Sequence, residues 1–198
     1  MKNKILIYIV IALAVAGVIF LFIRILKKMT SNPISSNIIK AARAFIGQKE
    51  LSGNSGFVSK QFETRMRQVG WNTGEAWCMY LAELAVKEGA ADLYAKCAAS
   101  FSGHTLTTAN NFKTRHPETI ISKAVPGCLV IWRLKGDTSG HAGVCTAVSG
   151  DTMTCVEGNT NNDGSREGYI TLEKTSPANR DRGNLQIYAM LDITRLKS

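Results

Sequence analysis

The 198-residue chain has no CxxC pair among its five cysteines, no internal repeat and no low-complexity tract. The missing CxxC pairs argue against a zinc ribbon and a dithiol redox motif, and we expect neither a metal ion nor a cofactor. An odd number of cysteines leaves at least one thiol free in a monomer. Hydrophobic residues make up 45% of the chain, which is enough for one compact domain with an appendage.

Acidic residues are absent from positions 1–28, which hold five lysines and arginines. The rest of the chain has 19 basic and 15 acidic side chains, so more than half of the formal charge of +9 flanks one apolar segment. No basic cluster of the kind that binds nucleic acid occurs elsewhere, and we expect no nucleic-acid partner.

The apolar segment, residues 5–23, contains no charged side chain and approaches the ~20 residues that a membrane-spanning helix needs. A cleaved signal peptide is the alternative, because Ala14–Ala16 is a small-x-small site. The apolar run continues beyond that site, which favours a transmembrane anchor over residues 1–28. No cysteine precedes Cys78, so we expect no lipoprotein signal.

A polar stretch predicts a linker over residues 29–36 and a folded domain over residues 37–198. Apolar residues at helical spacing predict four helices, over residues 37–47, 57–69, 77–89 and 92–99. Residues 100–127 are less regular. After residue 127 the spacing of apolar residues changes to that of strands. It predicts strands over residues 128–133, 142–148, 152–157, 169–172 and 185–191. Helices followed by antiparallel strands indicate an α+β fold.

Cys78 opens the third predicted helix, directly after Trp77. Free amide groups and the positive end of the helix dipole stabilise a thiolate at such a position, and the thiolate is the nucleophilic form. A buried cysteine that only fills space is the more common case, so position alone does not establish catalysis.

His141 enters a predicted strand, and a carboxylate follows on the next strand. If residues 149–151 form a three-residue loop, His141 faces Asn159, and Glu157 lies diagonally on the same face. A carboxylate or amide beside an imidazole fixes its tautomer and its orientation. A two-residue loop would send Glu157 to the opposite face.

The same register sets Cys145 opposite Cys155. Two interpretations are open: a pair of small core residues, or a cross-strand disulfide that an oxidising compartment would permit. We favour the first.

Four blocks, in this order and spacing, resemble the CHAP domain (cysteine, histidine-dependent amidohydrolase/peptidase): Gly74–Cys78, Pro126–Trp132, Gly140–Gly143 and Val156–Thr160. The resemblance runs from about residue 41 to the end of the chain. It implies a papain-like fold, with helices packed on an antiparallel sheet, and hydrolysis of peptidoglycan as an amidase or endopeptidase.

The resemblance also implies roles for single residues. The catalytic set is Cys78 as nucleophile, His141 as general base, Glu157 as the group that orients the histidine, and Asn159 as a helper or alternative third member. We expect Trp77 and Gly143 to contact the substrate, since a strand edge with little bulk lets a substrate chain approach closely.

These expectations describe a membrane-anchored peptidoglycan hydrolase with a Cys-His-Glu triad, of bacterial or phage origin. Its partners are peptidoglycan and, through residues 5–23, a lipid bilayer. The domain lies on the periplasmic or outer side of the membrane or belongs to a virion membrane. Two alternatives stay open: a thiol acyltransferase or crosslinking enzyme with the same triad, and a non-catalytic structural protein on a degenerate fold.

Overall fold

The computed structural model describes residues 13, 17, 20, 32–161 and 168–196, in two units, Met1–Asn32 and Pro33–Ser198. Most of the expected transmembrane segment lies outside the described residues. Among the described residues, no helix combines the length and the apolar character needed to cross a membrane.

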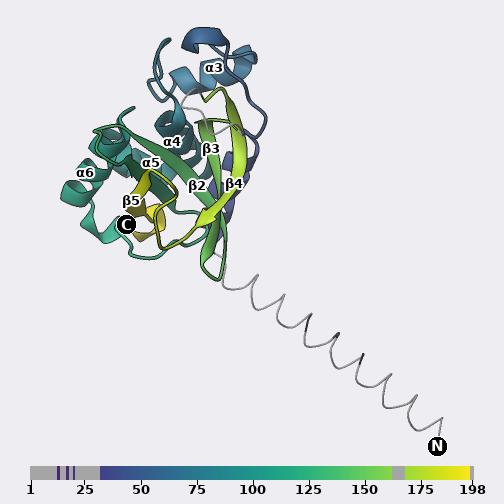
Figure 1. Cartoon of the computed structure of the whole chain (residues 1–198), viewed down its shortest axis with the longest axis vertical. Coiled ribbons are helices and arrows are strands. Elements are labelled where there is room, and N and C mark those ends of the chain that lie inside the picture. Colours follow the sequence, from purple (N-terminus) through teal and green to yellow (C-terminus); the bar gives the residue numbers. More distant parts are fainter. Residues whose placement is uncertain (1–12, 14–16, 18–19, 21–31, 162–167, 197–198) are drawn as a thin grey trace, which may run out of the picture. The chain divides into compact units, whose positions relative to one another are not determined.

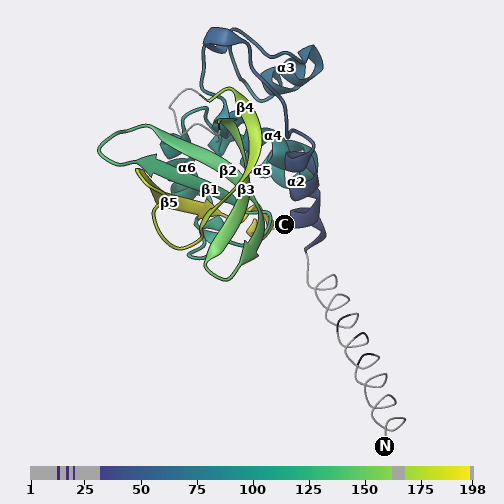
Figure 2. The same ribbon diagram turned by 45° about the vertical axis from the view of Figure 1, so that its right-hand side comes forward.

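The second unit has an α+β fold, in which α-helices precede a five-stranded antiparallel sheet. The helices are α2 (Pro33–Arg43), α3 (Lys60–Arg67), α4 (Cys78–Gly89), α5 (Ala91–Cys97) and α6 (Thr105–Arg115). The strands are β1 (Leu129–Leu134), β2 (Gly140–Ser149), β3 (Thr152–Thr160), β4 (Ile170–Pro177) and β5 (Leu185–Leu191). The sheet order is β4-β3-β2-β1-β5, so β5 returns across the sheet to pair with β1 (Figure 2).

Helix α2 begins at Pro33, inside the segment that we expected to be a linker. Proline suits the first helical turn, because the N–H that it lacks would have no acceptor there. Helix α3 is shorter than predicted, because Ser59 caps it by accepting a hydrogen bond from the Phe62 N–H at 3.2 Å. Val58 therefore lies outside the helix and is 65% exposed.

Helix α6 lies in the segment that showed no regular pattern. The side chain of His104 caps it by accepting a hydrogen bond from the Thr107 N–H. Its inner face combines apolar and polar residues: Thr105, Thr108, Ala109 and Phe112. Threonine is a weak helix former, so neither propensity nor apolar spacing indicated this helix.

The turn between β2 and β3 has two residues, since Ser149 pairs with Thr152. Of the two loop lengths that the sequence left open, the two-residue loop is therefore the one observed. A β-bulge at Thr146 adds one residue to β2 and restores the expected register beyond it, where Cys145 pairs with Cys155. The extra residue keeps Glu157 on the face of the sheet that carries His141.

The bulge at Thr146 is held by hydrogen bonds from two directions. The Thr146 hydroxyl donates to the Thr154 carbonyl at 3.2 Å and to the Glu173 carboxylate at 2.5 Å. Arg43 of α2 donates to the same carboxylate at 3.0 Å. Thr146 therefore has polar partners on β3 and β4, and Arg43 of α2 holds the partner on β4 in turn.

Two apolar clusters cover the two faces of the sheet. The larger contains the buried side of α4 and alternate strand residues: Leu129, Ile131, Ala142, Val144 and Val156. The smaller cluster contains residues that alternate with these along the strands and point to the other face: Cys128, Val130, Trp132, Cys145, Met153 and Cys155. Helix α4 is buried from Cys78 through Val86, so the hydrophobic effect fixes its position against the sheet.

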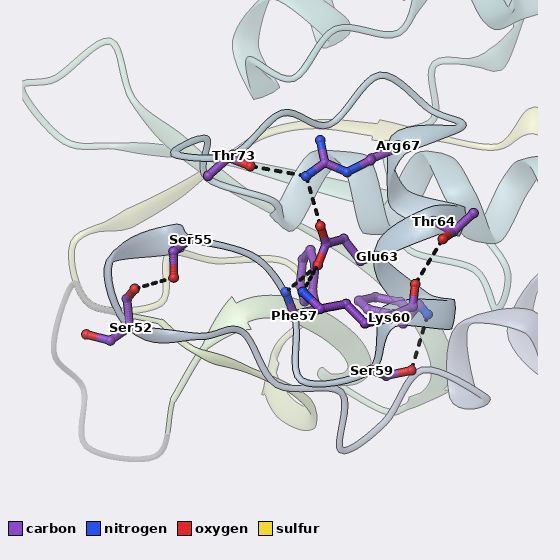
Figure 3. A network of polar contacts seen from close by, with 10 residues as sticks. Ser52, Ser55, Phe57, Ser59, Lys60, Glu63, Thr64, Arg67 and Thr73 are labelled. Atoms are coloured by element: carbon purple, nitrogen blue, oxygen red, sulfur yellow. Dashed lines mark hydrogen bonds and ion pairs between the residues drawn. The ribbon is translucent and has the colours of Figure 1, made fainter.

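The segment before α4 is held by a polar network around Glu63 of α3 (Figure 3). The carboxylate accepts hydrogen bonds from Lys60 at 2.8 Å, from Arg67 at 2.8 Å and from the Phe57 N–H at 3.1 Å. Hydrogen bonds from Lys60, Arg67 and Phe57 lower the pKa of Glu63 to about 2. Figures 1 and 2 show α3 and its flanking loops at one end of the unit.

Candidate active site

Cys78 is the first residue of α4 and is 5% exposed. The preceding residue, Trp77, occupies the N-cap position, and its side chain makes no capping hydrogen bond. The first N–H groups of an α-helix have no acceptor within the helix. These free N–H groups at the start of α4 lie beside the Cys78 thiol. They stabilise negative charge at this place.

His141 is the second residue of β2, and its side chain is 14% exposed. Its Nε2 lies 2.9 Å from Oε2 of Glu157, and its ring also interacts with the Cys78 thiol. Burial lowers the pKa of His141, but the interactions with Cys78 and Glu157 outweigh it and raise the pKa to about 9. Because Nε2 faces Glu157, Nδ1 is the ring nitrogen left for the thiol.

Glu157 of β3 is fully buried and accepts hydrogen bonds from two side chains. Besides His141, Arg182 donates through Nη1 at 2.6 Å and through Nη2 at 3.0 Å, one bond to each carboxylate oxygen. Burial raises the pKa of Glu157, but hydrogen bonds and charge from His141 and Arg182 lower it to about 2. The carboxylate is therefore ionised at neutral pH and fixed in orientation.

Arg182 is the residue of this site that the sequence did not indicate. It lies between β4 and β5, and its backbone exchanges two hydrogen bonds of 2.9 Å with Leu185. Its guanidinium also stands 4.7 Å from the centre of the Trp132 ring, which stacks on His141 at 5.9 Å. One side chain thus holds both the carboxylate and the aromatic ring that flank the imidazole. Nothing local to position 182 signals this role.

Gly143 lies in the interior of the sheet, between β1 and β3, and pairs with Glu157. A Cβ at this position would lie 2.9 Å from Cγ of Glu157 and 3.3 Å from Cβ of Cys155. The missing side chain therefore makes room for the Glu157 side chain to reach His141. Gly143 is buried and has strands on both sides, so packing is the role that the structure shows, and the expected substrate contact stays a prediction.

Trp77 is also fully buried, although we expected it to contact the substrate. Its indole N–H donates to Glu50 at 2.5 Å, and its ring lies 5.1 Å from that of Phe57. A Cβ at position 158 would lie 2.5 Å from the indole, so Gly158 lets β3 pack directly against it. As a buried side chain Trp77 supports the start of α4, and its contact with a substrate stays a prediction.

Asn159 has a φ of 51°, in the left-handed region that asparagine tolerates better than most residues. It stands at an irregularity in the pairing of β3 with β4. Among the described residues, no hydrogen bond joins its side chain to His141. Its role as a helper in catalysis stays a prediction.

The structure therefore brings three of the predicted residues together: Cys78, His141 and Glu157. Within the described part of the chain, no group of three histidine, cysteine or acidic side chains suits a metal ion. Comparison of the chain with protein-family models, with curated proteins and with solved structures finds no match.

Proposed function

We propose that this chain is a cysteine hydrolase with a papain-like fold of the CHAP type, which cuts amide bonds in peptidoglycan. The observation that carries the proposal is that His141 interacts with Cys78, at a helix start, and lies 2.9 Å from the buried carboxylate of Glu157. A thiol, an imidazole and a buried carboxylate in this order form a nucleophile, a general base and an orienting group.

In the first step the Cys78 sulfur attacks the amide carbonyl, and the thiol proton resides on His141. The carbonyl oxygen gains negative charge in the tetrahedral intermediate, where N–H groups of the first turn of α4 stabilise it. His141, as imidazolium, then protonates the leaving amine, and the C–N bond breaks. The products of this step are a free amine and a thioester on Cys78.

In the second step neutral His141 takes a proton from water, and the oxygen attacks the thioester. The C–S bond breaks, the carboxylic acid leaves, and the proton returns to the Cys78–His141 pair. Glu157 accepts the Nε2–H throughout, which fixes the tautomer and stabilises the imidazolium. Arg182 keeps Glu157 ionised and oriented through two hydrogen bonds.

The substrate class is supported by the four sequence blocks that resemble CHAP domains, which contain Cys78, His141 and Glu157. Peptidoglycan lies on the periplasmic or outer side of a bacterial membrane. The proposal therefore puts the domain on that side, with residues 5–23 as the membrane anchor. A bacterial wall-remodelling enzyme and a phage lytic enzyme both fit this arrangement.

Clearing of purified cell walls by the full chain in detergent tests the proposal. Cys78→Ala should abolish clearing while circular dichroism and thermal unfolding stay close to those of the parent protein. Cys97→Ala is the matched control, because Cys97 is a buried cysteine of α5 and is not among the residues of the site. Retained activity in Cys78→Ala would overturn the assignment.

The products separate the proposal from its alternatives. Mass spectrometry of the released fragments should show a new amine and a new carboxyl group. The position of the cleaved bond distinguishes an amidase from an endopeptidase. A new amide bond in place of the carboxyl group would indicate a thiol acyltransferase. No change in the wall and no thiol ester on Cys78 would indicate a non-catalytic protein.

A further inference from the structure

Three thiols outside the candidate site lie together in the smaller core, on neighbouring strands. Cys128, Cys145 and Cys155 are all fully buried, and the Cys145 thiol interacts with both others. They share a sheet face with the candidate site: a Cβ at Gly143 would touch both Cys155 and Glu157. Nothing in the proposed catalytic cycle uses these thiols.

The backbone geometry favours one pair among the three. Cys145 and Cys155 are directly opposite each other in the β2–β3 pairing. The Cys145 N–H donates to the Cys128 carbonyl at 2.9 Å, and its carbonyl accepts from the Gly127 N–H at 2.8 Å. Both backbone groups of Cys145 therefore point away from β3, so its pair with Cys155 is a non-hydrogen-bonded one.

In such a pair the Cα atoms are about 4.5 Å apart and the side chains are closer than in a hydrogen-bonded pair. A disulfide spans Cα separations of about 4.4–6.8 Å, so Cys145 and Cys155 need no backbone movement to join. Cys128 faces Cys145 across the hydrogen-bonded side, where the Cβ atoms are farther apart.

We infer that Cys145 and Cys155 form a cross-strand disulfide in an oxidising compartment, with Cys128 left as a free thiol beside it. This inference uses the proposed location outside the membrane but does not depend on the proposed catalytic activity. The bond would close the β2–β3 hairpin around the Thr146 bulge. It would thereby lock the register that sets Glu157 beside His141.

The oxidant is a small or protein disulfide, such as oxidised glutathione. The Cys145 thiolate attacks one sulfur of oxidised glutathione, and one glutathione thiol leaves. The Cys155 thiolate then attacks the Cys145 sulfur of the mixed disulfide, and the second glutathione thiol leaves. The two protein thiols are oxidised, and one disulfide is reduced to two thiols.

Burial limits access of an oxidant to the folded domain, so we place bond formation during folding. The same burial protects the completed bond from reduction.

Peptide mapping of the full chain, refolded with and without a glutathione redox mixture, tests the inference. Trypsin leaves Cys145 and Cys155 in one peptide, residues 136–166, and Cys128 in another, residues 124–133. Cleavage before Asp151 then separates Cys145 from Cys155 unless a disulfide joins them. After oxidation the two halves should stay joined without reductant, and Cys128 should be alkylated.

A Cys128–Cys145 crosslink, or alkylation of all three cysteines, would overturn the inference. Thermal unfolding gives a second readout. Closing a short hairpin should raise Tm by about 5–10 °C on oxidation. Cys128→Ala should keep this rise and Cys155→Ala should lose it; the reverse pattern would contradict the pairing. Cys78→Ala should form the same disulfide, so failure of the catalytic proposal would leave this result unchanged.

Discussion

Glu63 and Glu157 are two carboxylates with the same lowered pKa and different surroundings. Each has a pKa of about 2 and accepts hydrogen bonds from positively charged side chains. The charged donors to Glu63 are Lys60, three residues before it, and Arg67, four residues after it. The donors to Glu157 come from positions 16 and 25 residues away.

The two networks also differ in their contact with solvent. The Glu63 side chain is 13% exposed and its partner Lys60 is 73% exposed, so water screens much of this interaction. The Glu157 side chain is fully buried and Arg182 is 22% exposed. A buried charge that loses a partner costs far more than an exposed one. We therefore expect Glu63 to stabilise a loop and Glu157 to determine both activity and stability.

Replacing the buried carboxylate should have the largest effect. Glu157→Gln removes the negative charge that stabilises protonated His141 and frees its tautomer. We expect the rate of peptidoglycan hydrolysis to fall by about 10²–10⁴-fold, the range associated with a positioned acid–base group. The measurement is kcat/KM on a soluble muropeptide, with circular dichroism as the check of folding. A rate within threefold of the parent would remove Glu157 from the catalytic set.

Removing the cation behind Glu157 should have the next largest effect. Arg182→Met keeps an unbranched apolar stem but removes the guanidinium, which leaves the carboxylate with His141 as its remaining charged partner. We expect activity to fall by about 10–100-fold and the free energy of unfolding to fall by about 2–4 kcal/mol. Arg180→Met is the matched control, because Arg180 lies in the same loop and is not among the residues of the site.

A purely structural role for Arg182 would lower stability without moving the pH profile. If Arg182 positions the carboxylate for His141, the alkaline limb of the pH–rate profile should shift in Arg182→Met. Loss of stability with an unchanged profile would assign Arg182 to packing alone.

The contrast between the two glutamates also shows what the sequence could reveal. Charged partners at i,i+3 and i,i+4 spacing on a helix, as around Glu63, can be predicted from spacing alone. The position of Arg182 depends on how the chain returns from β4 to β5, and no local pattern describes that path. Long-range contacts of a single side chain are therefore the part of the site that was missed.

The register of β2 and β3 was predicted correctly at Cys145 and Cys155 but from an incorrect turn. A two-residue turn alone would have reversed the face of Glu157, and the bulge at Thr146 compensates for it. The indole of Trp77 packs against Phe57 and Gly158, which come from separate segments, and apolar spacing along the chain does not identify these neighbours. Apolar periodicity did identify α4 and all five strands.

The raised pKa of His141 predicts a pH dependence of moderate size. Its folded-state pKa of about 9 lies above the ordinary 6.5, so its contribution to stability is full below pH 6.5 and disappears as the pH rises through 9. The same titration removes the imidazolium that protonates the leaving amine. Activity should therefore decrease about tenfold per pH unit above pH 9.

Glu157→Gln sharpens this prediction, because the carboxylate is one of the groups that raise the pKa of His141. The alkaline limb of the residual activity should move to lower pH in this variant. An unmoved limb would mean that a group other than His141 controls it.

Glu63→Gln should have the smallest effect and should leave activity unchanged at 25 °C. We expect a loss of about 1 kcal/mol in the free energy of unfolding at pH 7, because an exposed charge-assisted network is weak. The folded-state pKa of about 2 lies below the ordinary 4.5, so this stabilisation is present above pH 4.5 and disappears as the pH falls towards 2. Urea unfolding of parent and variant should therefore differ at pH 7 and converge near pH 2. A loss of activity that matches Glu157→Gln would show that the two carboxylates are not separate in function, and that the loop before α4 controls the position of Cys78.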